Sequence, residues 1–308
     1  MSKIQKVAVL VTCYSRSRNL VEIFKSIPKS QTIYVSIDPA KTGDTFVISE
    51  QIEIKRIVQQ HQKYRNIEII NFKKHLGIRY AIPRAVTKIV KKYDWIVAIE
   101  DDVIPSKNFY KLAIKSINEL KSNKKIGHIS FYNCVPDTII SNPKNLYRFS
   151  IYPESYAWAT SKYAWRHYSD RPYLSFKKIL DYQKITDNKY FIVAWGINFL
   201  QTKFEILDTW AFRWIFSLWK ANLRCVSLNL NLVRYTGQDD GTHTITKQSW
   251  KEIRTTNEID IYNSEILPGV KEDIWLSKYV FGLNLTGVIK LSLSLVVRPL
   301  ISFLTKKF

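Results

Sequence analysis

Three carboxylates stand side by side at Glu100, Asp101 and Asp102, at the end of an apolar stretch that begins near Tyr93. Like charges at adjacent positions repel one another, and a buried strand that ends in them needs a positive partner. The sequence therefore predicts that a cation, or a cationic group, binds at the end of this strand.

The elements that must position this triplet follow from hydrophobic patterning. Apolar segments that end in small polar or acidic residues predict four buried strands, within residues 6–16, 31–43, 66–72 and 93–102. Helical spacing separates them, over residues 19–27, 46–64 and 75–93, the last with Pro83 in its first turn. This alternation predicts an α/β fold, with a mostly parallel central sheet covered by helices on both faces.

In open sheets of this kind ligands bind beyond the carboxyl ends of the strands. This places Thr12 to Arg16, Asp38 and the acidic triplet along one edge of the predicted sheet. The sequence has neither a P-loop nor a G-x-G-x-x-G motif, which argues against the familiar phosphate-cradling loops. An anion at this edge would be held by a metal ion and by side chains such as Arg16 and Arg79.

Composition limits the partners of the chain. Its 308 residues are 46% hydrophobic and 14% aromatic, which indicates a folded protein. A formal net charge of +21 favours an anionic partner: nucleic acid, an acidic membrane surface or a phosphorylated substrate. Three cysteines without a C-x-x-C pattern suggest neither a zinc site nor a disulfide framework. With no secretory signal of the usual layout at the N-terminus, the sequence predicts a cytoplasmic location.

Several blocks of sequence resemble those of one family. The strand ending in Glu-Asp-Asp, preceded by "TCYSR" and "SIDPA", resembles the GT-A nucleotide-diphospho-sugar glycosyltransferases, which hold a divalent metal with a D-x-D-like motif. The closer resemblance is to bacterial, family 2-like proteins related to N-acetylglucosaminyltransferase I. It continues in "HLGIRYAIPRAV", "IGHISFYN", "YRFSIYPESYAWATSKYAWRHY", "DTWAFRW" and "NLNLVRYTGQDDGTHT". These blocks keep the family's order from Lys6 to His243, and the resemblance implies a GT-A fold.

The resemblance also implies roles for individual residues. Asp102 would coordinate Mn²⁺ or Mg²⁺, which prefers oxygen ligands, while Glu100 and Asp101 would lie near the ribose and the donor sugar. Arg16 would contact the nucleotide and Asp38 the uracil ring. The whole donor site would comprise Thr12, Cys13, Arg16, Asp38, Arg79, Glu100 and Asp101, with Asp102 and His243 as metal ligands. Alternatively, Arg16 and Arg79 are ordinary surface charges and Asp38 opens an Asp-Pro turn.

The aromatic-rich middle of the chain predicts a sugar cleft, because the C–H faces of sugar rings pack on Trp and Tyr. We assign Trp158 and Trp210 to this cleft, and Glu154 as a side chain that binds a sugar or acceptor hydroxyl. The alternative for Glu154 is an exposed loop carboxylate. Trp165 is predicted to belong to the core.

An inverting transfer needs a general base that accepts the proton of the acceptor hydroxyl. The family's Trp-Asp pair is Trp210-Ala211 here, and Ala cannot accept a proton. The remaining candidates are Asp208 and Asp239, although Asp208 can equally be the N-cap of the following helix.

Residues 276–308 differ from the rest because they contain no acidic residue and interleave apolar residues with Lys and Arg. This pattern predicts a helical, basic amphipathic extension that lies on an anionic membrane surface; packing on the domain or on a second subunit is the alternative. Residues 1–275 would form the glycosyltransferase domain, with a nucleotide-binding half at 1–110 and an acceptor-binding half at 111–275.

The sequence thus predicts a metal-dependent, inverting glycosyltransferase, peripheral on the inner face of a bacterial cell membrane. It would use a UDP-linked sugar and a surface-glycan or lipid-linked acceptor. A sugar-phosphate nucleotidyltransferase is an alternative, but "VTCYSRSRN" lacks the Gly-rich loop of that class. A basic nucleic-acid-binding protein is another, but no RRM or OB module is recognisable, and no nucleic-acid partner is expected.

Overall fold

A nine-stranded sheet runs through the centre of the computed structural model, which describes residues 6–237 and 263–305, and side chains as far as Leu295. In spatial order the strands are β11 (Asn263–Pro268), β7 (Asn145–Ser150), β9 (Arg224–Leu228), β6 (Ile126–Ser130), β8 (Ala157–Ser161), β4 (Trp95–Glu100), β1 (Val7–Cys13), β2 (Ile33–Ile37) and β3 (Ile67–Asn71). A separate antiparallel pair joins β5 (Val103–Pro105) to β10 (Val233–Tyr235).

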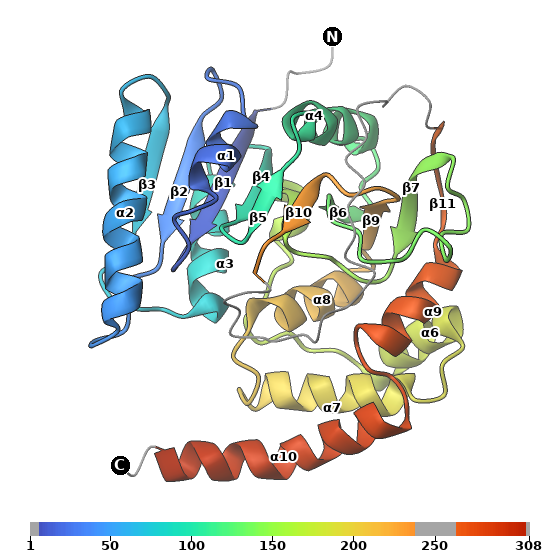
Figure 1. Ribbon diagram of the computed structural model, residues 1–308. Helices are drawn as coiled ribbons and strands as arrows, with labels where there is room; N and C mark the ends of the chain where they lie inside the picture. Colours follow the sequence, from blue (N-terminus) through green and yellow to red (C-terminus); the bar gives the residue numbers. More distant parts are fainter. Residues whose placement is uncertain (1–5, 238–262, 306–308) are drawn as a thin grey trace.

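Helices cover this sheet on both sides (Figure 1). They are α1 (Leu20–Lys25), α2 (Thr45–Gln62), α3 (Ile78–Ile89), α4 (Phe109–Leu120), α5 (Lys162–Trp165), α6 (Phe176–Thr186), α7 (Phe191–Lys203), α8 (Trp210–Lys220), α9 (Val270–Tyr279) and α10 (Leu285–Thr305). Five of the eight strand pairings in the large sheet are parallel. The predicted α/β fold with a mostly parallel sheet is therefore confirmed.

The apolar run of β1 explains how the two faces are covered. Val9, Val11 and Cys13 point into one core, which α1, α2 and α4 complete. The alternating residues Ala8 and Leu10 point into a second core, which α3, α5 and α8 complete. Successive side chains of a strand point to opposite faces, so a continuous apolar run is what a strand covered on both faces requires.

The helix α3 begins later than the sequence predicts. It starts at Ile78, after Gly77 with φ of +73°, and Pro83 is its sixth residue rather than part of its first turn. Pro83 is buried against the sheet together with Ile82 and Val86, so its ring contributes to packing at the cost of one backbone hydrogen bond.

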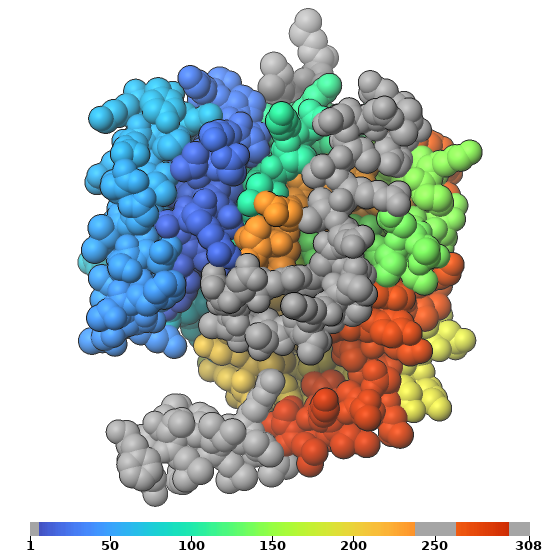
Figure 2. Space-filling model, in the orientation of Figure 1, coloured from blue at the N-terminus to red at the C-terminus, as the bar shows by residue number. Residues whose placement is uncertain are grey.

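The C-terminal part of the described chain forms a helical layer, and the helical tail is confirmed. The helices α7 and α10 lie side by side below the sheet in Figure 1. Gln201 of α7 donates a hydrogen bond to Ser294 of α10, and Val288 and Leu291 pack against the main core. The space-filling view shows the N-terminal elements on the left and α10 along the lower surface (Figure 2). None of the described helices is both long enough and apolar enough to cross a membrane.

Candidate active site

The carboxyl ends of β1, β2 and β4 meet at one edge of the sheet, as predicted. Parallel pairing aligns Thr12 with both Ser36 and Glu100. Thr12 is half-buried within the strand, and Cys13 is buried in the core beneath the edge. Burial raises the pKa of the Cys13 thiol, and the nearby charge of Asp101 raises it further. The loops that follow these three strands are therefore the ones that can reach a ligand here.

Asp101 fixes the loop that follows β1. Its Oδ2 accepts hydrogen bonds from the backbone N–H groups of Tyr14 and Ser15, at 2.8 and 3.3 Å. Its Oδ1 lies 3.6 Å from Nη1 of Arg16. Asp101 is only 6% exposed, and burial raises its pKa while these hydrogen bonds and Arg16 oppose the shift. Asp101 therefore orients the loop that carries Arg16.

Asp102 lies beside the same arginine, with its Oδ2 3.9 Å from Arg16 Nη1. Burial raises the pKa of Glu100 well above its usual range, and Asp102 and Asp101 raise it further, while Arg16 opposes the shift. One guanidinium thus faces two buried carboxylates, with the half-buried Glu100 next to them in the chain. The predicted excess of negative charge at the end of β4 is present in the structure.

A divalent metal ion fits the chemistry of this group. The carboxylate oxygens of Asp102 and Glu100 are the hard ligands that Mn²⁺ or Mg²⁺ prefers, and a cation would offset their repulsion. In the part of the chain that the structure describes, no cluster of three or more His, Cys, Asp or Glu side chains could hold a metal on its own. Sites for these metals often use one or two carboxylates and complete the shell with water and substrate phosphates.

Two tyrosines border the triplet and were not singled out from the sequence. Tyr156 and Tyr235 have ring centroids 4.7 Å apart, and the Tyr156 carbonyl accepts a hydrogen bond from Glu100 N. Burial raises the pKa of Tyr235, and Asp102 raises it further. The signal that could have identified Tyr235 is its place in "VRYTGQDD", directly before the second acidic pair of the chain.

The segment that ends β10 lies against the triplet. Thr236 donates from its backbone N–H and its Oγ1 to the Asp102 carbonyl, at 2.7 and 2.9 Å. Asn19 joins the two segments, because its Nδ2 donates to the Asp101 carbonyl and to Thr236 Oγ1. The predicted site residues Asp239 and His243 lie outside the described residues.

Asp38 is engaged by the loop that precedes α3. Its two carboxylate oxygens accept hydrogen bonds from Leu76 N and Gly77 N, at 2.8 and 2.9 Å, and His75 Nδ1 lies 3.2 Å from Oδ2. Asp38 therefore connects the end of β2 to the start of α3. Its predicted contact with a uracil ring stays a prediction.

Arg79 does not point freely toward a donor phosphate, and this prediction is corrected. Its guanidinium is 3% exposed and donates two hydrogen bonds to Asp170, at 2.9 and 2.6 Å. The Oε1 of Glu205 lies 3.2 Å from Nη2 of the same guanidinium. Because carboxylates of the chain already neutralise this guanidinium, it is an internal ion pair that attaches α3 to the loop before α6.

Asp208 is not the N-cap of α8. Thr209 takes that place, with its Oγ1 accepting a hydrogen bond from Ala211 N. The Asp208 side chain is 68% exposed, with its Oδ1 3.8 Å from Arg79 Nη1. A Cβ on Gly77 would lie 4.0 Å from Asp208 Oδ2, so this carboxylate lies beside the loop held by Asp38. Its position is compatible with the predicted role as a base.

Glu154 has a mainly internal role. Its Oε1 accepts hydrogen bonds from the backbone N–H and the Sγ of Cys134, at 3.0 and 3.1 Å. Its Oε2 lies 3.5 Å from Nη2 of Arg148, and both side chains are less than a tenth exposed. Glu154 is therefore neither an exposed loop carboxylate nor a group directed at solvent.

Trp158 and Trp210 were predicted to line a sugar cleft, and this prediction is wrong. Each is 1% exposed, and their rings stack on each other with centroids 5.1 Å apart. His128 stacks on Trp158. The ring centroids of Trp158 and Trp165 lie 6.2 Å apart in the same core. The physical reason is that Trp158 lies on β8, where its side chain faces α8 across the second core. The prediction that Trp165 belongs to the core is confirmed.

Comparison with known proteins adds a set of distant structural likenesses. Neither a protein-family model nor a curated protein matches the sequence. Among solved structures, the chain is similar to S. aureus TarS (residues 1–349), at 14% identity and a TM-score of 0.43, over 76% of this chain and 61% of that one.

Two further solved structures are described in complex with sugar-containing ligands. Glucosyl-3-phosphoglycerate synthase from Mycobacterium tuberculosis, in complex with Mn²⁺, UDP-glucose and phosphoglyceric acid, is 12% identical with a TM-score of 0.31, over 55% of this chain and 60% of that one. The galactosyltransferase LgtC, in complex with donor and acceptor sugar analogs, is 12% identical with a TM-score of 0.31, over 57% and 64%. This chain spans less than two thirds of the length of each.

Proposed function

We propose that the chain is a metal-dependent, inverting glycosyltransferase that takes a sugar from a UDP-linked donor. The acceptor would be a bacterial surface glycan or a lipid-linked glycan. The observation that carries this proposal is the pairing of Arg16 with the buried carboxylates of Asp101 and Asp102, at the carboxyl edge of a parallel sheet. A nucleoside diphosphate carries negative charge and sugar hydroxyls, which an arginine, a metal ion and carboxylates can bind together.

Each residue would then have a defined task. Asp102, with Glu100 nearby, would hold Mn²⁺ or Mg²⁺, which when bound offsets the negative charge of the leaving diphosphate. Arg16 would bind the diphosphate, and Asp101 would keep the Arg16 loop in place. Tyr156 and Tyr235 would border the donor sugar.

The transfer itself exchanges one bond at the anomeric carbon. The acceptor hydroxyl oxygen attacks this carbon while the bond to the diphosphate oxygen breaks, and the hydroxyl proton passes to a carboxylate. Asp208 is the first candidate for this carboxylate, because its side chain is exposed and lies beside Gly77. Asp239 is the second candidate, because Thr236, three residues before it, is bonded to Asp102.

Calorimetric titration of UDP, GDP and CDP, in Mn²⁺ and in EDTA, tests the donor site. We expect one nucleotide, UDP, to bind in Mn²⁺, and Asp102→Ala to weaken this binding by about tenfold or more, as loss of a metal ligand does. Asp181→Ala, which removes an exposed carboxylate of α6, is the matched control and should bind like wild type. Absence of binding by all three nucleotides would contradict the proposal.

The base is tested separately with Asp208→Asn and Asp239→Asn. The variant that lacks the true base should lose turnover by a factor of about 10² to 10⁴, while its nucleotide affinity stays unchanged. If both variants retain turnover, neither carboxylate is the base.

We also propose that α10 binds the inner face of the bacterial membrane. Leu285, Ile289 and Leu293 recur every four residues along one side of the helix and are 59%, 50% and 60% exposed. Lys290 lies beside them, and an apolar stripe next to a cation suits an anionic lipid surface.

Co-sedimentation with phosphatidylglycerol vesicles tests this surface. Replacing Leu285, Ile289 and Leu293 by Ser should abolish sedimentation. Replacing Ile48 and Ile52, exposed apolar residues of α2, by Ser should leave it unchanged. Equal sedimentation of all three proteins would show that α10 is not the membrane-binding element.

A further inference from the structure

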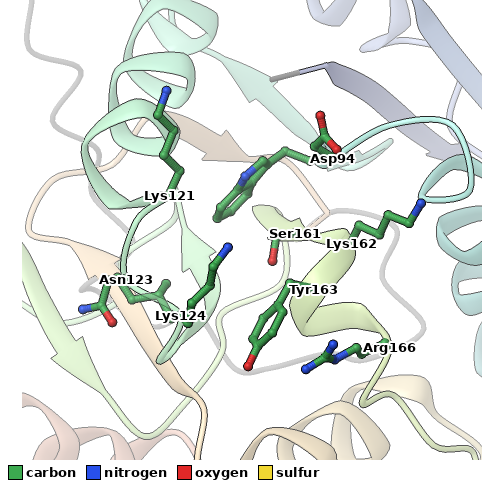
Figure 3. Close-up of a pocket in the computed structure, with 10 residues that line it drawn as sticks. Asp94, Lys121, Asn123, Lys124, Ser161, Lys162, Tyr163 and Arg166 are labelled. Carbon is green, nitrogen blue, oxygen red and sulfur yellow. The ribbon is translucent and has the colours of Figure 1, made fainter. Parts of the chain in front are cut away.

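A hollow of about 360 Å³ opens at the amino-terminal edge of the sheet, at the opposite end of β4 from the acidic triplet (Figure 3). Asp94 and Trp95 stand at the start of this strand and line the hollow, whereas Asp101 follows its end. A strand rises by about 3.3 Å per residue, so the two places are roughly 20 Å apart. The hollow is therefore separate from the candidate active site.

Four cationic side chains line this hollow: Lys121, Lys124, Lys162 and Arg166. They come from the end of α4, from the loop before β6 and from α5. Among the described residues, none of them forms an ion pair with a carboxylate. The single carboxylate of the lining, Asp94, accepts a hydrogen bond at 3.1 Å from the backbone N–H of Lys6. The hollow thus has an excess of positive charge.

The ring of Tyr163 fixes two of these cations. Arg166 Cζ lies 4.0 Å and Lys124 Nζ 5.3 Å from the ring centroid, and Tyr163 lies between the two side chains in Figure 3. Cation–π contact restrains both heads near the hollow, which lowers the entropy cost of holding them on a ligand.

The positive charge continues beyond the hollow. Other exposed cations belong to segments that meet at this edge of the sheet, before β1, before β4 and before β6: Lys6, Lys91, Lys92 and Lys125. Clustered like charges without carboxylate partners raise the local potential and attract anions. Arg166 adds a planar fork of N–H donors, which matches the oxygens of a phosphate.

We propose that this hollow binds a phosphate group, at a site separate from the donor site. The ligand is a phosphate ester, on a polymer, on a lipid headgroup or on a small molecule. Lys124 and Arg166 contact it first, and Lys121 and Lys162 add to the field. This site requires no metal ion, so it does not depend on the function proposed for the acidic triplet.

Calorimetric titration of pyrophosphate in EDTA, at low ionic strength, tests the site. Lys124→Gln combined with Arg166→Gln should weaken binding by about tenfold or more, because the two nearest charges are removed. Lys55→Gln on α2 with Lys63→Gln just after it makes the same change in net charge and should alter the affinity less than about twofold. Asp102→Ala should bind pyrophosphate like wild type under these conditions.

Arg166→Lys keeps the charge and removes the planar fork, so it should give an intermediate affinity even if the double variant folds poorly. Undetectable pyrophosphate binding by the wild type overturns the proposal. An equal loss in the two double variants also overturns it, since binding would then depend on overall charge alone.

The source of the phosphate is then identified with two further probes, long-chain polyphosphate and glycerophosphoglycerol. The second is the soluble headgroup of phosphatidylglycerol and lacks the acyl chains that the apolar stripe of α10 would contact. If the wild type binds polyphosphate alone and the Lys124/Arg166 variant loses it, the natural ligand is a polymer or a small phosphate ester. If the wild type binds glycerophosphoglycerol and the variant does not, the ligand is a lipid headgroup. Unchanged binding of both probes in the variant counts against the site.

Discussion

The guanidinium of Arg79 donates two hydrogen bonds to the carboxylate of Asp170, which lies 91 residues further along the chain. Hydrogen bonding from Arg79 lowers the pKa of Asp170, so the pair is ionised at neutral pH. Arg213, which is fully buried, lies 3.0 Å from the same carboxylate. This network attaches α3 to α8, and Asp208 sits at its margin beside Arg79. Arg79 therefore lies beside the candidate base, with its guanidinium paired to Asp170.

Asp170→Asn should lower the free energy of unfolding by about 2 kcal/mol, because it leaves the buried Arg79 with weaker partners. Arg79→Ala should cost somewhat more, and the two changes together less than their sum, since they remove the same interaction. Urea unfolding of both single variants and the double variant measures this coupling. Glu53→Ala, which breaks the exposed ion pair with Arg56, is the control and should leave stability almost unchanged. Additive losses would show that Arg79 and Asp170 do not interact.

We expect different roles for Asp101 and Asp102: Asp101 fixes the loop after β1, and Asp102 binds the metal ion. Asp101→Asn removes the negative charge from the acceptor of both hydrogen bonds, so these bonds weaken and the amide protons of Tyr14 and Ser15 should exchange faster with solvent. Asp102→Asn should leave these amides unchanged and remove only the metal dependence of nucleotide binding. Hydrogen exchange of the free protein measures the first effect without any ligand. Unchanged exchange in Asp101→Asn would mean that the loop is held by other contacts.

Trp158→Ala should destabilise the protein by about 3–5 kcal/mol, as expected for loss of a fully buried aromatic side chain. Trp158→Phe should cost less because it keeps part of the stacking on His128. Nucleotide affinity of the folded fraction should stay the same in both variants, which unfolding curves combined with calorimetry can establish. A stable Trp158→Ala protein with reduced sugar-nucleotide affinity would return Trp158 to the binding site.

The N-terminal half of the fold was predictable because its signals are local. A short continuous apolar run such as Val7–Val11, ended by small polar residues, is typical of a strand covered on both faces, and the carboxyl ends of parallel neighbours share an edge. The negative cluster at the end of β4 could also be predicted, because adjacent carboxylates at the end of a buried strand require a compensating charge.

The burial of Arg79 and Trp158 was not predictable, because it depends on partners that are distant in the sequence. Nothing near Arg79 in the sequence indicates that Asp170 will neutralise it. The sequence around Trp158 is typical of a sugar-binding aromatic cluster. In the structure, β8 places Trp158 against Trp210 and His128 in the core. The basic hollow was missed for the same reason, since Lys121, Lys162 and Arg166 converge only when β4, β6 and β8 pair.

Stability should depend on pH through Asp273, a buried carboxyl at the start of α9. It accepts hydrogen bonds from Ser150 Oγ and Ile151 N, at 2.6 and 3.0 Å, yet burial raises its pKa to about 7. An unfolded Asp has a pKa of about 3.9, so the folded protein binds this proton more tightly. The contribution of Asp273 to stability is therefore greatest below about pH 4 and falls as pH rises to about 7, by up to about 4 kcal/mol.

Asp273→Asn should remove this dependence, because an amide does not titrate. Its oxygen can still accept from Ile151 N, and its NH₂ group can donate to Ser150 Oγ. Urea unfolding at pH 5 and pH 8 should show a smaller loss of stability on raising the pH in the variant than in wild type. Asp181→Asn changes an exposed carboxylate of α6 and should keep the wild-type profile. Parallel pH profiles for Asp273→Asn and wild type would mean that the two hydrogen bonds keep Asp273 ionised in spite of its burial.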